Sequence, residues 1–153
     1  MKNVLISIKP KWVKKIADGK KTIEVRKSQP KLSTPFKCYI YCTVDGFKSI
    51  FQSKKWLSHN GHVCNGKVIG EFICKCVTQY PWVEMEGEMC YFIPTVEGEC
   101  TGLDYDDVVE YGAGGDVFFW SISDLKVYDK PLELSALCIK RAPQDWCYVE
   151  EPA

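Results

Sequence analysis

Short strand-like runs recur along this 153-residue chain without a helix between each pair, and this pattern limits the fold more than any other feature. An alternating run at 22–26 and apolar runs at 4–8, 37–43, 68–80, 117–128 and 146–149 predict strands. Regular strand–helix alternation is missing, which excludes a parallel α/β sheet. The pattern therefore predicts an α+β class, a mixed β-barrel of roughly five to seven strands flanked by two or three helices.

The helix signals are few and local. Pro10 suits the first turn of a helix, because its missing N–H costs nothing there, and Trp12, Val13 and Ile16 follow at helical spacing. Gly19 is a natural residue to end that helix. Further helices are expected at 104–111 and, with a basic character, at 47–57, and Asn-Gly pairs at 60–61 and 65–66 predict turns.

Size and composition indicate one domain covering residues 1–153. The chain is 46% hydrophobic, which argues against disorder, and no apolar run approaches the roughly 20 residues that span a bilayer. The N-terminus carries lysines where a signal peptide would present a cleavage site. We therefore expect a cytoplasmic protein without membrane association, whose nine cysteines are free thiols. Cys42, Cys74 and Cys76 lie in strand-like runs and are expected to act as small hydrophobic residues.

The charges are balanced in number but divided in position. Residues 1–80 hold 16 Lys and Arg against four acids, a net +12, and residues 81–153 hold four against 16, a net −12. The total of zero argues against an extended nucleic-acid groove. The division favours a small basic site for an anion in the first half.

The densest group of charged residues follows the first helix. Gly19, Lys21, Glu24 and Arg26 place a helix stop, a cation, a carboxylate and a guanidinium within eight residues. On the expected strand, Ile23 and Val25 would face the core, and Glu24 and Arg26 would share the opposite face. Such a group can be an electrostatically coupled site, or it can be an ordinary ion pair on a solvated edge strand.

These four residues match the G-x-K-x-x-E-x-R signature of the ASCH (activating signal cointegrator homology) domain, and the chain resembles the small stand-alone bacterial and phage proteins of that family. Four further segments, in order, are similar to those relatives: 7–11 (SIKPK), 68–72 (VIGEF), 120–125 (WSISDL) and 141–146 (RAPQDW). The resemblance covers nearly the whole chain. It implies a PUA-like β-barrel with a cleft, lined by the signature strand, that receives RNA or a modified nucleotide.

Carried over by residue, the resemblance places Lys21, Glu24 and Arg26 in that cleft, with Lys9 nearby. The two lysines could neutralise phosphate or polarise a carbonyl, and Arg26 could bind an anion or orient Glu24. Glu24 could accept a hydrogen bond from the exocyclic amine of a base.

Gln144 and Trp146 are further candidate ligand-binding residues. An amide hydrogen bond and a stacking ring both suit a nucleobase. The alternative for Trp146 is packing against the barrel. The expected partner is RNA or a modified nucleoside or nucleotide, with no cofactor, no metal and no obligatory protein partner.

Enzymatic activity is the second hypothesis, with Lys21 and Glu24 as catalytic residues. Some ASCH relatives remove the acyl group of N4-acetylcytidine, but a Thr stands where this chain has Glu24, and losing a hydroxyl nucleophile usually removes a reaction. Ribonuclease activity also occurs among relatives, and Lys21 and Glu24 could serve as its base and acid.

Three other groups of residues are candidate sites. His59, His62 and Cys64 carry metal-ligand chemistry, but the fourth ligand of a zinc site is missing, so a pair of loop histidines is expected. A cation–aromatic mixture could bind nucleic acid or form an amphipathic helix; it comprises Lys48, Phe51, Lys54, Lys55, Trp56 and Lys67. The acidic segment 84–116 could present a surface to a basic partner.

Overall fold

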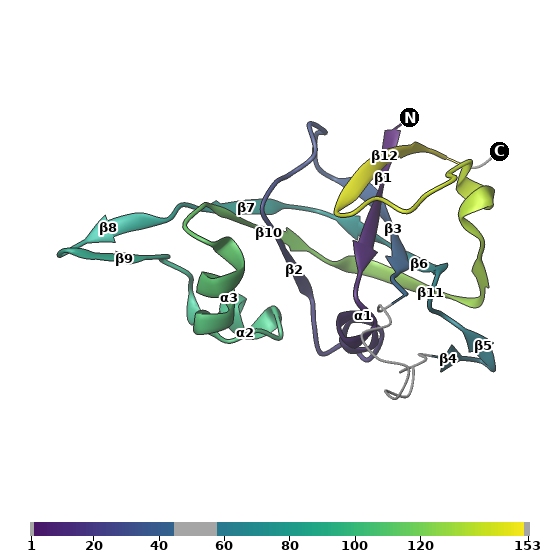
Figure 1. The fold of residues 1–153 in the computed structure, drawn as a ribbon, viewed down its shortest axis with the longest axis horizontal. Coiled ribbons are helices and arrows are strands. Elements are labelled where there is room, and N and C mark those ends of the chain that lie inside the picture. The colour runs from purple at the N-terminus through teal and green to yellow at the C-terminus, as the bar shows by residue number, and fades with distance from the viewer. Residues whose placement is uncertain (1, 45–57, 152–153) are drawn as a thin grey trace.

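The protein folds into two main sheets and three α-helices, in a computed structural model that describes residues 2–44 and 58–151. Figure 1 shows the sheets together, α1 below them, and one hairpin that projects to the left. The α+β class predicted from the sequence is confirmed. Among the described residues, strand pairing does not close the sheets into a barrel.

The larger sheet has the strand order β11-β6-β3-β1-β12. Only β1 and β3 run parallel among its pairs, and the other pairs are antiparallel. Its strands are β1 (Lys2–Ile8), β3 (Phe36–Cys42), β6 (Lys67–Cys74), β11 (Ser123–Leu132) and β12 (Trp146–Glu150). The smaller sheet has the order β2-β10-β7, with β2 (Ile23–Arg26), β7 (Val77–Tyr80) and β10 (Val117–Ser121).

Two hairpins complete the strands. β4 (Ser58–His59) pairs with β5 (His62–Val63), and β8 (Val83–Met85) pairs with β9 (Glu88–Cys90). Asn60 and Gly61, which form the first turn, both have positive φ, as the predicted Asn-Gly turn requires. The predicted basic helix at 47–57 lies outside the described residues.

Two expected strands are each divided between the sheets, which corrects the sequence reading of 68–80 and 117–128. The chain leaves β6 for β7 at Lys75 and Cys76, and it leaves β10 for β11 beside Ile122. Both crossings meet at Ser121, whose hydroxyl oxygen accepts the backbone N–H groups of Lys75 and Cys76 at 3.1 and 3.0 Å. Because Cys76 lies at the bend, its side chain is exposed, contrary to the expectation.

Two of the three described α-helices, the first and the third, match their sequence signals. α1 (Pro10–Ala17) begins at the predicted proline and buries Val13 and Ile16, and Gly19 follows it with φ of 76°. α3 (Tyr105–Gly112) is capped by Asp104, whose carboxylate accepts the N–H of Asp107 at 2.8 Å. α2 (Thr95–Cys100) and a 3₁₀ turn (Leu134–Leu137) had no clear sequence signal.

The core has three parts. Val4, Ile6, Ile40 and Phe72 pack between the larger sheet and α1, where Trp120 joins them from the smaller sheet. The other face of the larger sheet packs on Leu137 and its neighbours. A third cluster lies between the smaller sheet and α3. All nine cysteines are free, as expected from the sequence.

Candidate functional site

Strand β2 carries Glu24 and Arg26 of the signature, and Lys21 lies two residues before the strand begins. In its pairing with β10, Glu24 lies opposite Trp120 and Val25 lies opposite Phe119. Cross-strand partners share a face, so Glu24 is on the face of the fully buried Trp120, and Val25 packs on the face that α3 covers. Both faces of β2 are therefore covered, and the solvated-edge interpretation of this strand is wrong.

Lys21 is a buried cation held at three sides. Its side chain is 1% exposed, and its ammonium donates to the backbone oxygen of Thr101 at 2.5 Å. The same Nζ lies 3.8 Å from Glu24 Oε1 and 5.3 Å from the centre of the Trp12 ring. Burial lowers the pKa of Lys21 below its ordinary value, although the Glu24 charge opposes that effect. At a given pH, a larger fraction of this lysine is therefore in the neutral amine form than of a surface lysine.

Arg26 connects three segments of the chain. Its Nη2 donates to the backbone oxygen of Ser7 at 2.6 Å, and its Nη1 donates to Asp145 Oδ1 at 2.7 Å. Burial alone would lower the pKa of Arg26, but the charges of Glu24 and Asp145 raise it, so the guanidinium stays charged.

Glu24 has one carboxylate oxygen without a hydrogen-bond partner. Oε1 accepts the N–H of Val25 at 3.0 Å. Oε2 is buried, lies 3.8 Å from Arg26 Nη2, and accepts no hydrogen bond. A buried acceptor left unpaired costs about 1–3 kcal/mol, and more when it is charged. A donor group on a ligand would remove that cost, so Oε2 is the atom of the cluster that can still accept a hydrogen bond.

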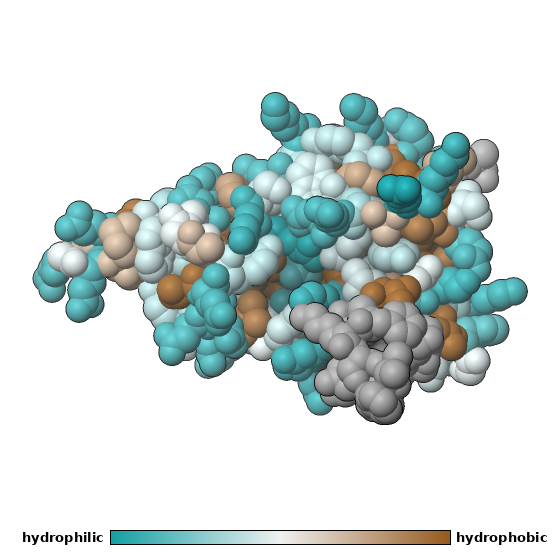
Figure 2. Space-filling model, in the orientation of Figure 1, coloured by the Kyte–Doolittle hydropathy of each residue, from teal (hydrophilic) through white to brown (hydrophobic). Residues whose placement is uncertain are grey.

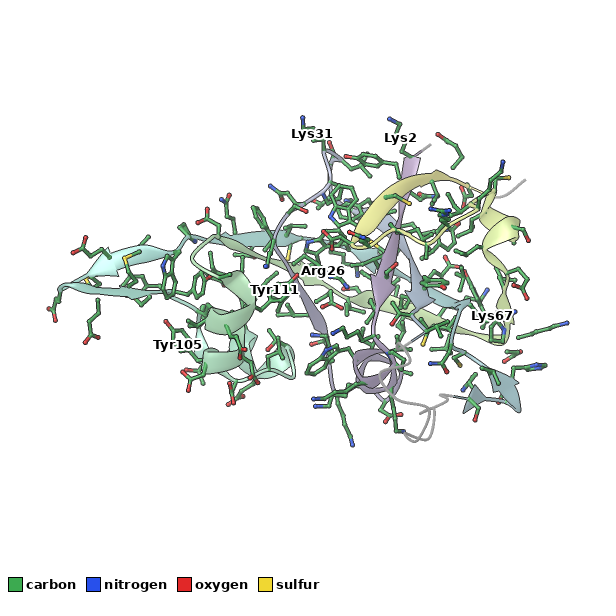
Figure 3. All side chains as sticks on the ribbon, in the orientation of Figure 1. Lys2, Arg26, Lys31, Lys67, Tyr105 and Tyr111 are labelled. Atoms are coloured by element: carbon green, nitrogen blue, oxygen red, sulfur yellow. The ribbon has the colours of Figure 1, made fainter. Side chains whose placement is uncertain are left out.

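An aromatic ring lies at the edge of this cluster. Figure 3 shows Tyr111 of α3 beside Arg26 of β2. The Lys27 ammonium lies 5.0 Å from the centre of the Tyr111 ring, which is partly exposed. Burial raises the pKa of Tyr111, the Arg26 charge opposes this, and the Asp145 and Glu24 charges add to it. The cluster therefore joins a buried acceptor, buried cations and an accessible ring.

The other predicted site residues lie around this cluster in different environments. Lys9 is exposed at the N-cap of α1, and Gln144 is exposed beside Asp145. Trp146 is partly buried; its ring packs edge-on to Trp120 at 5.9 Å, and its indole N–H donates to Ser28 Oγ at 2.9 Å. The packing alternative for Trp146 is confirmed.

Three contributors were missed by the sequence reading: Asp145, Thr101 and Tyr111. Each meets the signature across 80 or more residues of chain, as the Lys21–Thr101 and Arg26–Asp145 bonds show. Local periodicity carries no signal for contacts at that range. Asp145 stands in the 141–146 segment that supported the resemblance, and this was the one available indication.

The remaining candidate groups lie elsewhere. His59 and His62 face each other across an exposed hairpin, whereas Cys64 is buried. Within 2–44 and 58–151, no three His, Cys, Asp or Glu side chains gather to hold a metal ion. Of the cation–aromatic group only Lys67 is described; it pairs with Glu133, and the other members lie outside the described residues.

Two surface cavities are separate from the signature cluster. The larger, of about 550 Å³, lies over β3, β6 and β11, and three of its charged groups form ion pairs with one another. Lys37 lies 3.2 Å from Glu71 and 2.9 Å from Glu151, and the Tyr128 hydroxyl donates to Glu71 at 3.0 Å. The second, of about 420 Å³, has mainly apolar walls such as Leu32 and Phe36. The signature cluster is the better candidate site, because Glu24 Oε2 can still accept a hydrogen bond from a ligand.

The two sheets, the helix before the signature strand and the buried Lys–Glu–Arg cluster together define a class of mixed α+β protein, and comparison with solved structures identifies its fold. A crystal structure of ASCH from Zymomonas mobilis is 19% identical, with 97% of this chain and 88% of that chain covered and a TM-score of 0.66. One mutant of that protein is 18% identical, with 97% of this chain and 91% of that chain covered and a TM-score of 0.65. A second mutant is 19% identical, with 97% of this chain and 89% of that chain covered and a TM-score of 0.66. The chain therefore has the ASCH fold, as the signature residues implied.

No protein-family model matches the chain, and no curated protein does. Among the helices of the described residues, none is long and apolar enough to cross a membrane.

Proposed function

We propose that this chain is an ASCH protein with a PUA-like barrel that binds single-stranded RNA or a modified nucleoside at the cluster of Lys21, Glu24 and Arg26. The proposal is supported by the ASCH fold, which spans 97% of the chain, and by the signature residues that meet in one buried cluster. The cytoplasm is the compartment in which such a ligand would be met.

The open Oε2 atom of Glu24 is the observation that carries the proposal. It is a buried carboxylate oxygen that lies 3.8 Å from Arg26 Nη2 and accepts no hydrogen bond, while Lys21 Nζ lies 3.8 Å from the other oxygen, Oε1. The exocyclic amines of cytosine and adenine are donors of the matching kind, and a hydrogen bond to an ionised carboxylate is about twice as strong as a neutral one.

Tyr111 and Lys27 supply the other two contacts that a nucleotide needs. A partly exposed ring can stack on a base, which is worth about 1–3 kcal/mol per base. The Lys27 ammonium, held over that ring, can meet a phosphate. The ligand class therefore combines a donor-bearing base with an anionic group.

Binding of short single-stranded RNA and of free nucleosides tests this function. We expect the wild-type protein to prefer oligo-C and oligo-A to oligo-U, and Glu24→Gln to weaken binding of the first two about tenfold. Glu110→Gln, the same change on the exposed face of α3, is the control and should have no effect. Absence of binding to every probe at low salt would refute the proposal.

Hydrolysis at the same cluster is a second candidate, favoured by the lowered pKa of Lys21. A buried amine with a reduced pKa is a better base or nucleophile near neutral pH than an ordinary lysine. The test is turnover of N4-acetylcytidine and of single-stranded RNA, with Lys21→Met expected to abolish it. Binding without turnover of either substrate would contradict hydrolysis and would leave binding as the one proposed function of the cluster.

A further inference from the structure

The hairpin of β8 and β9 projects from the body of the protein with uncovered apolar side chains. Figure 1 shows it extending away from both sheets, and Figure 2 shows apolar side chains among hydrophilic ones at that end of the molecule. Met85 is 50% exposed, Met89 47% and Phe92 59%. The hairpin and the segment directly after it therefore leave three large apolar side chains uncovered.

The apolar side chains occupy both faces of the hairpin. Met85 is paired with Glu88, so those two side chains share one face, and Glu84 is paired with Met89 on the other. A flat partner surface would cover only one of the methionines. A groove that receives the hairpin would cover both.

The base of the hairpin is anchored, so the projecting part is held in place before any partner binds. The Trp82 ring packs on Tyr91 at 4.7 Å, and the N–H of Tyr91 donates to the Tyr105 hydroxyl at 2.9 Å. Asp116 accepts the N–H of Trp82 at 3.1 Å. A two-stranded hairpin is only marginally stable alone, and this anchoring reduces the entropy that binding would cost.

Charge determines the kind of partner. Residues 81–116 contain no Lys or Arg and ten acids, of which Glu84, Glu86 and Glu88 alternate with the methionines on the hairpin itself. Such a surface repels nucleic acid and anionic lipid and attracts cations. Methionine side chains adapt to irregular apolar surfaces.

We propose that this hairpin is a docking element for a second protein, inserted into an apolar groove whose rim carries Lys or Arg. The methionines fill the groove and the three glutamates pair with its rim. This site is separate from the signature cluster, and it requires neither RNA binding nor hydrolysis.

Three synthetic helical-hairpin peptides, each with a groove between its two helices, serve as probes in fluorescence anisotropy. The first (Lys/Leu) has Leu in the groove and Lys at its rim, the second (Lys/Ser) has Ser in the groove and Lys at its rim, and the third (Glu/Leu) has Leu in the groove and Glu at its rim. We expect saturable binding of the Lys/Leu peptide, binding of the Lys/Ser peptide at least about tenfold weaker, and none of the Glu/Leu peptide. Equal binding of the Lys/Leu and Lys/Ser peptides would mean that only charge is recognised, which overturns the proposal. Absence of Lys/Leu binding overturns it as well.

Paired variants locate the contact. The double change Met85→Ser and Met89→Ser should weaken Lys/Leu binding about tenfold, whereas Val63→Ser, at an exposed valine of the other hairpin, should not. Glu84→Lys with Glu88→Lys should abolish binding, and Glu110→Lys should have a much smaller effect. Equal losses in variant and control overturn the proposal. So does self-association of the wild-type protein that the Met85/Met89 variant abolishes, because a second copy would then cover the hairpin.

Discussion

Arg26 is where a single side chain connects three parts of the fold. Its two terminal nitrogens bind the end of β1 at Ser7 and the segment before β12 at Asp145, while β2 itself carries the residue. A lysine at this position would have one ammonium and could not reproduce the planar fork. The geometry of the whole cluster therefore depends on the identity of this cation as well as on its charge.

Arg26→Lys is expected to lower the free energy of unfolding by about 1–3 kcal/mol, because one buried acceptor loses its donor. Urea denaturation measures the change. Asp145→Asn is the comparison, because in that variant Arg26 keeps its hydrogen bond to the Ser7 oxygen. Asp145 is 47% exposed, so the free energy of unfolding should fall by less than in Arg26→Lys. A larger loss in Asp145→Asn than in Arg26→Lys would contradict this account of the arginine.

Lys21 predicts a pH dependence in the alkaline range. Its pKa in the folded protein lies below the unfolded value, so between the two the unfolded chain binds the extra proton and the free energy of unfolding rises with pH. Above the unfolded pKa both states are neutral and the contribution is constant. The destabilisation by the buried charge is complete below the folded pKa.

The difference in unfolding free energy between the wild type and Lys21→Met should therefore change across the alkaline window, in favour of the wild type as the pH rises. Denaturation at a series of pH values from neutral to above 10.5, the ordinary pKa of lysine, measures it. Lys20→Met, at the exposed neighbouring residue, is the control and should show no such change relative to the wild type. A constant difference for Lys21→Met would contradict the lowered pKa.

At the scale of elements, local signals predicted α1, α3 and most strands, and they failed where tertiary contacts decide the structure. Pro10 and Gly19 bound α1 as expected, and Asp104 caps α3. The apolar run at 68–80 gave no sign of its division, because the bend depends on Ser121, which lies 45 residues beyond Cys76. For the same reason the alternation in β2 did not reveal that its polar face would be buried against Trp120.

α3 supports the docking hairpin through a close contact that only glycine allows. A Cβ at Gly112 would overlap the Tyr91 hydroxyl and come within 3.2 Å of Val117. That hydroxyl is fixed, since it donates to the backbone oxygen of Gly115 at 2.5 Å. The helix and the base of the hairpin are therefore packed as one unit.

Gly112→Ala is expected to lower the free energy of unfolding by about 1–3 kcal/mol through overpacking. Gly98→Ala, in α2, is the matched control: its nearest neighbour would be at 3.8 Å, so the better helix propensity of alanine should leave stability unchanged or slightly raised. Thermal denaturation of both variants separates the outcomes. If Gly112→Ala left the free energy of unfolding unchanged, Tyr91 would be able to move aside without cost, which would contradict the close contact.

At the scale of the molecule, the division of charge matches the different ligands proposed for the two sites. The basic first half carries the signature cluster, and the acidic segment carries the docking hairpin and the helix that bears Tyr111. Acids near the cluster oppose the attraction of the lysines for long polyanions. A short ligand that enters the cluster is less affected, because its contacts are local and partly desolvated.

Neutralising part of the acidic segment should therefore increase indiscriminate polyanion binding. We expect a variant with Gln at Glu86, Glu88, Glu99 and Glu110, whose net charge rises from 0 to +4, to bind random duplex DNA about tenfold more tightly at low salt. The variant with Asp at the same positions keeps the charge and should bind DNA as the wild type does. Nucleoside binding at the cluster should be unchanged in both, since nucleosides carry no phosphate. Tight binding of duplex DNA by the wild type that persists as salt is raised would contradict this role of the acidic segment.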